Sequence, residues 1–200
     1  MNDQNLDIYF DEDFTKILET WGLDNAWNEV QLLLSNHQGK VLDIACGTGK
    51  VIEILSRFKN LDLYGCDISD MLIWTAVKRG IPGSKLAVCD ATSLPYSDNE
   101  FEYCYSIGSI EHFNEVGIVK FIEESHRTTR KISFHMLPVS KSGLDEGWKV
   151  TSDQSYFNNS VEWWIGKFNS IYDPVVVLDS VWEDDCSTGK WFICKKNKIV

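Results

Sequence analysis

The stretch 41–50, with the sequence VLDIACGTGK, constrains the fold more than any other part of this chain. Its first half is apolar apart from Asp43 and predicts a short buried strand. Gly47 and Gly49 then permit a tight turn and a close approach of the backbone to a ligand. Apolar residues recur at helical spacing over 51–58, so a helix is predicted next. A strand, a glycine turn and a helix in this order present free backbone N–H groups to a ligand.

Two classes of cofactor are compatible with such a turn. Dinucleotide-binding chains carry a third glycine three residues after the second, but this chain has Ile52 there, which argues against a pyrophosphate on the helix. The segment 43–49 instead resembles the first motif of the class I S-adenosylmethionine-dependent methyltransferases, although that family often has Gly where this chain has Ala45. The resemblance implies that the segment lines the cofactor through Asp43, Ala45, Cys46, Gly47 and Gly49.

The second predicted strand, 61–66, runs directly into Asp67. A carboxylate at the end of this strand, about twenty residues beyond the glycine turn, can accept hydrogen bonds from both hydroxyls of an adenosine ribose. The alternative is an Asp that only caps the following helix. We expect Ile68 and Met71, at the start of that helix, to lie beside the same cofactor.

The third predicted strand, 85–89, leads into Asp90, Ala91 and Thr92. In the methyltransferases that the chain resembles, an acidic residue here binds the adenine amine, and the next backbone amide reaches a ring nitrogen. The resemblance implies that these three residues hold the adenine. A nicotinamide enzyme has no comparable need for this element, so the segment favours the sulfonium cofactor.

The fourth predicted strand, 103–107, ends at Ile107 and is followed by the segment GSIEHF. In the family, this strand end lies beside the methyl donor. The sequence Ile-Glu-His-Phe resembles the corresponding segment of methyltransferases that act on small metabolites. His112 is a candidate general base because histidine titrates in the useful pH range, with shaping of the pocket as the alternative. Glu111 is a second candidate, and it could instead bind the methionine amino group or the substrate.

The last third of the chain matches the family by pattern only. A fifth strand is predicted at 130–137, followed by a polar loop. A helix is expected to open at Ser152, and two strands joined by a short polar turn then predict an antiparallel hairpin. His135 near the end of the fifth strand and Trp148 in the loop are candidates to border the substrate, with structural roles as the alternative.

Residues 1–38 precede the first predicted strand and contain two segments with apolar residues at helical spacing. They are expected either to cover the sheet or to form a lid over the cofactor, with Tyr9 or Trp27 touching it.

Charge and cysteine usage narrow the class of partner. The formal net charge is -11, which disfavours a nucleic-acid substrate and an acidic membrane surface. The start of the chain has no basic and apolar signal segment, and no apolar stretch is long enough for membrane insertion. The six cysteines form no CxxC pair, and we expect reduced thiols, a cytoplasmic protein and no catalytic metal.

The expected fold is α/β, with a Rossmann-like, seven-stranded and mostly parallel sheet, an antiparallel last strand and helices on both faces. We expect one domain over 1–200, with a helical lid at 1–38 and the core at 39–200. The expected function is methyl transfer from S-adenosyl-L-methionine to a small-molecule acceptor such as a sugar, a lipid head group or a secondary metabolite, with oxygen slightly preferred. A non-catalytic, cofactor-binding regulatory or partner subunit is the alternative. The sequence leaves the acceptor and the oligomeric state open.

Overall fold

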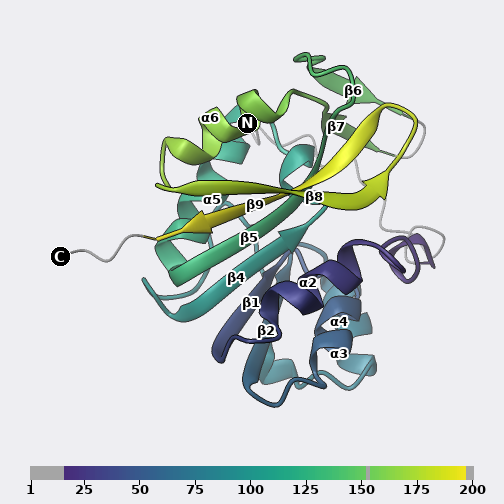
Figure 1. The fold of residues 1–200 in the computed structure, drawn as a ribbon. Coiled ribbons are helices and arrows are strands. Elements are labelled where there is room, and N and C mark those ends of the chain that lie inside the picture. Colours follow the sequence, from purple (N-terminus) through teal and green to yellow (C-terminus); the bar gives the residue numbers. More distant parts are fainter. Residues whose placement is uncertain (1–15, 152–153, 197–200) are drawn as a thin grey trace.

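A computed structural model describes residues 16–151 and 154–196 of the chain. Its centre is a seven-stranded sheet in the order β3-β2-β1-β4-β5-β9-β8 (Figure 1). All the strands run parallel except β9, which pairs antiparallel with both of its neighbours. The expected fold class is therefore confirmed. The strands are β1 (Gly39–Ile44), β2 (Leu61–Asp67), β3 (Leu86–Val88), β4 (Phe101–Ile107), β5 (Thr129–Ser140), β8 (Val175–Glu183) and β9 (Ser187–Lys195), and a separate hairpin consists of β6 (Trp148–Val150) and β7 (Ser155–Phe157).

Helices cover both faces of the sheet (Figure 1). One apolar cluster joins α2 and α3 to one face, and a second cluster joins α5 and α6 to the opposite face. Because both faces are buried, the central strands read as continuous apolar runs rather than as alternating ones. The helices are α2 (Ala26–Leu34), α3 (Lys50–Leu55), α4 (Asp70–Lys78), α5 (Glu115–Thr128) and α6 (Val161–Asn169), with short 3-10 turns η1 (Gly83–Lys85) and η2 (Ile110–His112).

The side chains of β4 show how the pleat serves two cores. Tyr103 and Tyr105 point into the cluster under α2 and α3, whereas Cys104 points into the cluster under α5 and α6. All three side chains are buried. Successive side chains of a strand point to opposite faces, so one strand contributes to both layers.

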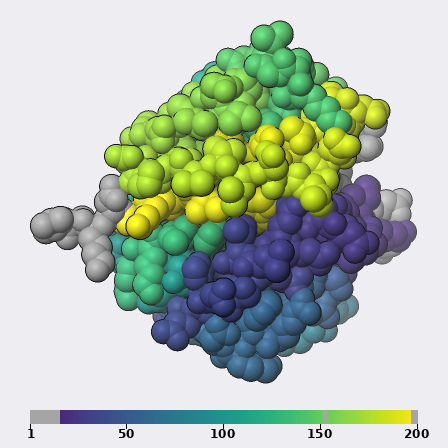
Figure 2. Space-filling model, viewed as in Figure 1, coloured from purple at the N-terminus to yellow at the C-terminus, as the bar shows by residue number. Residues whose placement is uncertain are grey.

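The N-terminal helix is fastened to the C-terminal strands. Glu29 of α2 accepts hydrogen bonds from the indole Nε1 of Trp191 at 2.6 Å and from the backbone N–H of Val181 at 2.7 Å. Figure 2 shows the corresponding surfaces in contact, with the purple N-terminal segment against the yellow-green C-terminal strands. The two ends of the described chain therefore stabilise each other over one face of the sheet.

One predicted helix begins later than the sequence indicates. The expected start at Ser152 is wrong, because residues 155–157 form β7 and pair with β6. The helix begins only after Ser160, whose hydroxyl accepts a hydrogen bond from the N–H of Trp163 at 3.1 Å. Asp145 in turn accepts hydrogen bonds from the N–H and hydroxyl of Ser160. These contacts join residues that are distant in sequence, so helical periodicity alone gives the wrong start. Within the described residues, no helix has both the length and the apolar character that a bilayer span requires.

Candidate functional site

The carboxyl ends of four parallel strands surround one cavity of about 300 Å³. The cavity lies where the strand order reverses between β1 and β4, which is the usual ligand position in an open α/β sheet. Its volume lies at the lower end of the range of small-molecule sites. Nine residues predicted for the cofactor or for catalysis line this cavity: Ala45, Gly47, Asp67, Ile68, Asp90, Ala91, Ile107, Glu111 and His112.

The turn after β1 has the left-handed backbone that its glycines favour. Gly47 has φ +53° and Gly49 has φ +72°, and Ala45 shares this region with φ +62°. A Cβ atom on Gly49 would lie 2.5 Å from Cδ1 of Ile81 and 2.9 Å from Cβ of Ala76, so that position must be glycine for the helices to pack. Gly49 does not line the cavity, and its role in the fold is close packing rather than ligand contact.

Asp67 connects the turn to the next strand end. Its Oδ2 accepts a hydrogen bond from the N–H of Gly47 at 2.9 Å, and its Oδ1 accepts one from the N–H of Ser69 at 2.9 Å. Burial raises the pKa of this carboxyl, while the backbone donors partly offset that rise. Each carboxylate oxygen has a second lone pair that could accept a further hydrogen bond from a ligand.

The segment 90–92 after β3, which the sequence predicts to hold the adenine, is held by local hydrogen bonds. Asp90 Oδ1 accepts from both the N–H and the hydroxyl of Thr92 at 2.8 Å. Asp90 and Ala91 lie on the cavity wall, whereas Thr92 supports Asp90 and does not line the cavity. On α4 the lining residue is Leu72 rather than the predicted Met71.

A smaller hollow of about 50 Å³ adjoins the turn. Six of the predicted cofactor residues line it: Asp43, Cys46 and Trp27, which do not line the main cavity, and Ala45, Gly47 and Ile107, which line both. Asp43 is buried and accepts a hydrogen bond from the hydroxyl of Tyr105 at 2.8 Å across the β1–β4 pair. Burial raises the pKa of Asp43 well above its usual value. Asp43 thus has a structural partner and does not reach the main cavity.

His112 has a defined tautomer because of its partner. Its Nδ1 lies 2.8 Å from the backbone carbonyl oxygen of Ser155, which can only accept, so Nδ1 carries the hydrogen. The Nε2 atom of neutral His112 is then a free base, and it lies 3.8 Å from Oε1 of Glu111. Glu111 itself is buried, which raises the pKa of its carboxyl. The pair can take up one proton on Nε2 and hold it beside a carboxylate.

Two predicted substrate residues lie elsewhere. His135 is fully buried, with Nδ1 2.8 Å from the hydroxyl of Ser106 and Nε2 3.1 Å from that of Ser125. Burial lowers the pKa of His135 to about 3, so it is a neutral core residue and does not line the cavity. Trp148 packs on Phe157 within the β6–β7 hairpin, with ring centroids 5.0 Å apart, and is also absent from the wall. Tyr9 lies outside the described residues.

Several wall residues were not predicted from the sequence. Most of them come from segments far from the motifs and are aromatic or apolar, as ordinary core residues are, so the sequence does not distinguish them. Asp184 also lines the cavity, and it accepts hydrogen bonds from the N–H groups of Cys186 and Ser187. The others include Ile17, Leu18 and Trp21 before α2, and Met136, Pro138, Gln154, Tyr156 and Trp182 from the C-terminal half.

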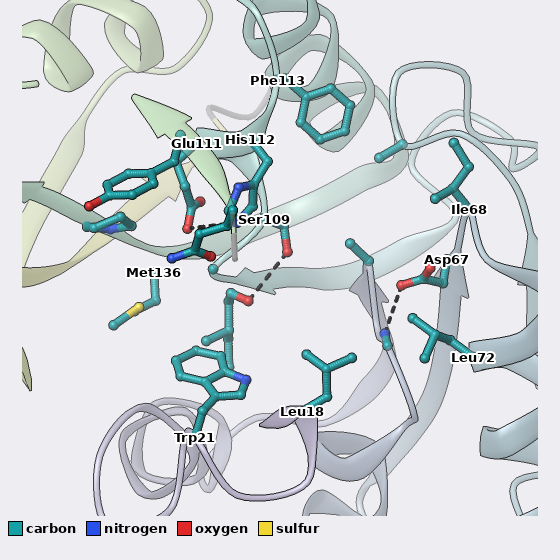
Figure 3. A pocket seen from close by; sticks show the side chains of 18 of the residues that line it. Leu18, Trp21, Asp67, Ile68, Leu72, Ser109, Glu111, His112, Phe113 and Met136 are labelled. Atoms are coloured by element: carbon teal, nitrogen blue, oxygen red, sulfur yellow. Dashed lines mark hydrogen bonds and ion pairs between the residues drawn. The ribbon is translucent and has the colours of Figure 1, made fainter. Parts of the chain in front are cut away.

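The cavity has two chemically different ends (Figure 3). In the region that the structure describes, no group of three or more His, Cys, Asp or Glu side chains could hold a metal ion. Figure 3 shows Glu111, His112 and Met136 at one end, Asp67, Ile68 and Leu72 at the other, and Ser109 between them.

Comparisons with known proteins agree with this geometry. Residues 41–131 match the family model described as "Methyltransferase domain". "Probable tRNA methyltransferase 9B" of Mus musculus is 37% identical over 91 residues, which cover 44% of this chain and 19% of that protein. "Demethylmenaquinone methyltransferase" of Thermotoga maritima is 36% identical over 86 residues, which cover 42% of this chain and 37% of that protein. This chain thus spans well under half the length of these relatives.

A solved structure supports the fold over nearly the whole chain. It is the 1,6-didemethyltoxoflavin-N1-methyltransferase of Burkholderia thailandensis, solved with bound 1,6-didemethyltoxoflavin and S-adenosylhomocysteine. The TM-score is 0.71 at 13% identity, and the match covers 93% of this chain and 86% of that one. The two comparisons agree: residues 41–131 match the methyltransferase domain family, and the sheet as a whole has the fold of the S-adenosylmethionine-dependent methyltransferases.

Proposed function

We propose that this protein transfers a methyl group from S-adenosylmethionine to a small-molecule acceptor, with oxygen slightly preferred as the receiving atom. One observation carries the proposal. The cavity extends without a break from Asp67, at the predicted ribose position, to His112, whose Nε2 is a free base. A binding-only protein has no need for a second compartment with a base in it.

The walls at the Asp67 end fit the cofactor. Among the described residues, a Cβ atom on Gly47 would have only Leu18 Cδ1 near it, at 3.5 Å, so this turn is less tightly packed than the position of Gly49. The two oxygens of Asp67 each retain one lone pair for a ribose hydroxyl. We assign the adenine to Asp90 and Ala91. Asp43, Cys46 and Trp27 support the turn from the adjoining hollow in this proposal.

The other end of the cavity suits a compact acceptor. It is walled by side chains from three separate parts of the chain, including Trp21, Met136 and Tyr156. The ring centroids of Tyr156 and His112 are 6.5 Å apart, which brings the C-terminal half of the chain next to the candidate base. Largely apolar walls around a cavity of this size favour a small acceptor.

The names of the relatives include both a tRNA and a quinone methyltransferase, so the family alone does not fix the acceptor. The charge of this chain favours the small molecule. A formal charge of -11 repels a phosphate backbone, whereas proteins that bind nucleic acid use many Lys and Arg contacts to phosphates.

The reaction requires few catalytic groups from the protein. The cofactor supplies an activated methyl group on a sulfonium, so alignment of the acceptor makes the largest contribution. The Asp67 and Asp90 segments orient the nucleoside in this proposal. His112 Nε2 then takes the proton that an acceptor hydroxyl loses, and the Glu111 carboxylate at 3.8 Å stabilises the imidazolium.

A labelling experiment tests the proposal. The protein is incubated with S-adenosylmethionine labelled in the methyl group and with fractionated pools of small metabolites, and in parallel with tRNA. We expect label in a small product, and much less label with Asp67→Asn protein at a cofactor concentration that does not saturate the variant. Tight binding of S-adenosylhomocysteine with no transfer to any pool would contradict catalysis, and label in tRNA would contradict the acceptor class.

A further inference from the structure

Glu111 has an unsatisfied carboxylate oxygen. The side chain lies in η2, is 3% exposed and lines the cavity. Its Oε2 atom is buried and has no hydrogen-bond partner among the described residues. Its Oε1 atom lies 3.8 Å from Nε2 of His112, and the backbone N–H groups of Ser109 and Glu111 also act on the carboxyl. A buried carboxylate is costly unless it is paired, so an atom of this kind on a cavity wall points to a missing donor.

The other wall carboxylates each accept a hydrogen bond from the described residues, and none of their oxygens is buried and unsatisfied as Oε2 of Glu111 is. Asp67 accepts from two backbone N–H groups, Asp90 accepts from Thr92, and Asp184 accepts from two backbone N–H groups. The unsatisfied oxygen is therefore specific to the Glu111 end. Rotation about the terminal torsion of a Glu side chain is soft and exchanges its two oxygens, so the carboxylate can present an unsatisfied oxygen to the cavity.

The sign of the wall charge restricts what the acceptor can be. The described lining residues include four carboxylates but no Lys or Arg. Arg79, the nearby guanidinium next to the turn, already bonds the carbonyl oxygen of Thr48, Glu53 and Glu19. A phosphate or carboxylate on the acceptor would therefore meet four acidic side chains and no Lys or Arg among the described lining residues. An anionic acceptor would have to be desolvated without a cationic partner, which is strongly unfavourable.

We propose that the acceptor carries an amino group, and that this group docks on the Glu111 carboxylate at the end of the cavity opposite Asp67. This inference rests on the proposed function and names its acceptor class, which is an uncharged apolar or aromatic body bearing a primary or secondary amine. The amine supplies the donor that Glu111 lacks. Tyr156 and Trp182 on the same wall offer aromatic surfaces that favour a cation and an apolar body.

The proposal concerns how the acceptor is recognised. Which acceptor atom receives the methyl group depends on where the sulfonium lies. It differs from the two acceptor classes named by the relatives, because both tRNA and a quinone lack the required cation. It also competes with one other use of Glu111, which is pairing with the amino group of the cofactor itself. If Glu111 pairs with the amino group of the cofactor, Glu111→Gln should weaken cofactor binding. If it pairs with the acceptor amine, the same substitution should leave cofactor binding unchanged.

Calorimetric titration tests the proposal on the complex of the full chain with saturating S-adenosylhomocysteine. The probes are matched triplets in which one skeleton carries an amine, an alcohol or a carboxylate: tryptamine, tryptophol and indole-3-propionate, and phenethylamine, 2-phenylethanol and 3-phenylpropionate. We expect the amine of at least one triplet to bind about tenfold more tightly than its alcohol, because hydrogen bonds to charged groups are worth roughly that much. We expect the carboxylates not to bind.

Two variants locate the effect. Glu111→Gln should remove the preference for the amine and leave the affinity for S-adenosylhomocysteine within about twofold of wild type. Glu123→Gln, which makes the same change of charge at an exposed position of α5, should keep the preference. Wild-type protein alone also decides the matter if Glu111→Gln does not fold, because equal or better binding of alcohols and carboxylates overturns the proposal.

Three further outcomes would overturn it. They are an amine preference that survives in Glu111→Gln, a large loss of S-adenosylhomocysteine affinity in that variant, and no binding of any amine to a complex that has formed. Failure of the wild-type chain to bind S-adenosylhomocysteine would instead contradict the proposed function, so the two failures are distinguishable.

Discussion

His112 donates a hydrogen bond through Nδ1 to the backbone carbonyl oxygen of Ser155 at a distance of 2.8 Å. Ser155 belongs to β7, which lies outside the main sheet, so a strand of the small hairpin sets the tautomer of the candidate base. The consequence is a free Nε2 beside Glu111, and the first prediction depends on it.

Replacing His112 by Ala should lower turnover by about 100-fold or more, since a positioned general base contributes roughly that factor. The affinity for S-adenosylhomocysteine should stay unchanged, because the Nε2 end of the cavity is remote from Asp67 in Figure 3. Initial rates and calorimetry give the two quantities. His37→Ala, which removes a histidine that stacks on Tyr103, serves as the control. Wild-type turnover in His112→Ala protein would remove this residue from the mechanism.

Asp67→Asn should weaken S-adenosylhomocysteine binding by about 1.5–3 kcal/mol, since hydrogen bonds to a charged acceptor are worth that much. The side chain would keep its size but lose its negative charge and one of the two oxygens that accept hydrogen bonds from the ribose hydroxyls. Asp62→Asn is the matched control, because Asp62 is exposed on the same strand. Calorimetry with circular dichroism separates a loss of affinity from a loss of fold. Equal affinities of the two variants would exclude the ribose role.

Ala45→Gly should stabilise the protein by about 0.5–1 kcal/mol. Ala45 has φ +62°, and a left-handed backbone costs a residue with a Cβ roughly 1–2 kcal/mol. The greater entropy of Gly in the unfolded chain offsets about half of the gain. Ala87→Gly in the extended strand β3 should instead destabilise by about 0.5–1 kcal/mol. Urea denaturation measures both, and a loss of stability in Ala45→Gly would show that the turn relies on the Ala45 methyl group.

His135 should make the fold sensitive to mild acid. Burial lowers its pKa from 6.5 to about 3, so the unfolded chain binds a proton that the folded chain rejects. The stability that this histidine contributes is complete above pH 6.5 and is lost as the pH falls toward 3. Between these two pH values, the free energy of unfolding falls by up to about 1.4 kcal/mol per pH unit.

The buried carboxyls of Asp43, Asp67 and Glu111 act in the opposite direction, because their pKa values are raised. The difference between wild type and His135→Gln isolates the histidine. Urea midpoints at several pH values from 7 down to about 4 should fall more steeply for wild type than for His135→Gln. Parallel curves would mean that His135 is protonated in the folded state.

The glycine turn, Asp67 and Asp90 are recognisable in the sequence because each lies at the end of a parallel strand. Parallel strands end at one edge of the sheet, so finding the strands is enough to predict that these residues converge. The same logic failed for His135, because a residue near a strand end still points to one of two faces. The pleat turns His135 into the core beside Ser106 and Ser125.

The acceptor end was not predictable in the same way. Trp21, Tyr156 and Trp182 lie far apart in the sequence and share no motif, so only tertiary packing brings them to one wall. The β6–β7 hairpin was read as loop and helix because its strands have three residues each, too few to show a period of two. The sequence therefore identifies the cofactor half of the site better than the acceptor half.

A crystal structure of the protein soaked with S-adenosylhomocysteine tests the central claim most directly. We predict the ribose hydroxyls on Asp67, the adenine against Asp90 and Ala91, and the sulfur directed toward the Glu111–His112 end of the cavity. A nucleoside bound elsewhere, or a sulfur directed away from His112, would contradict the account.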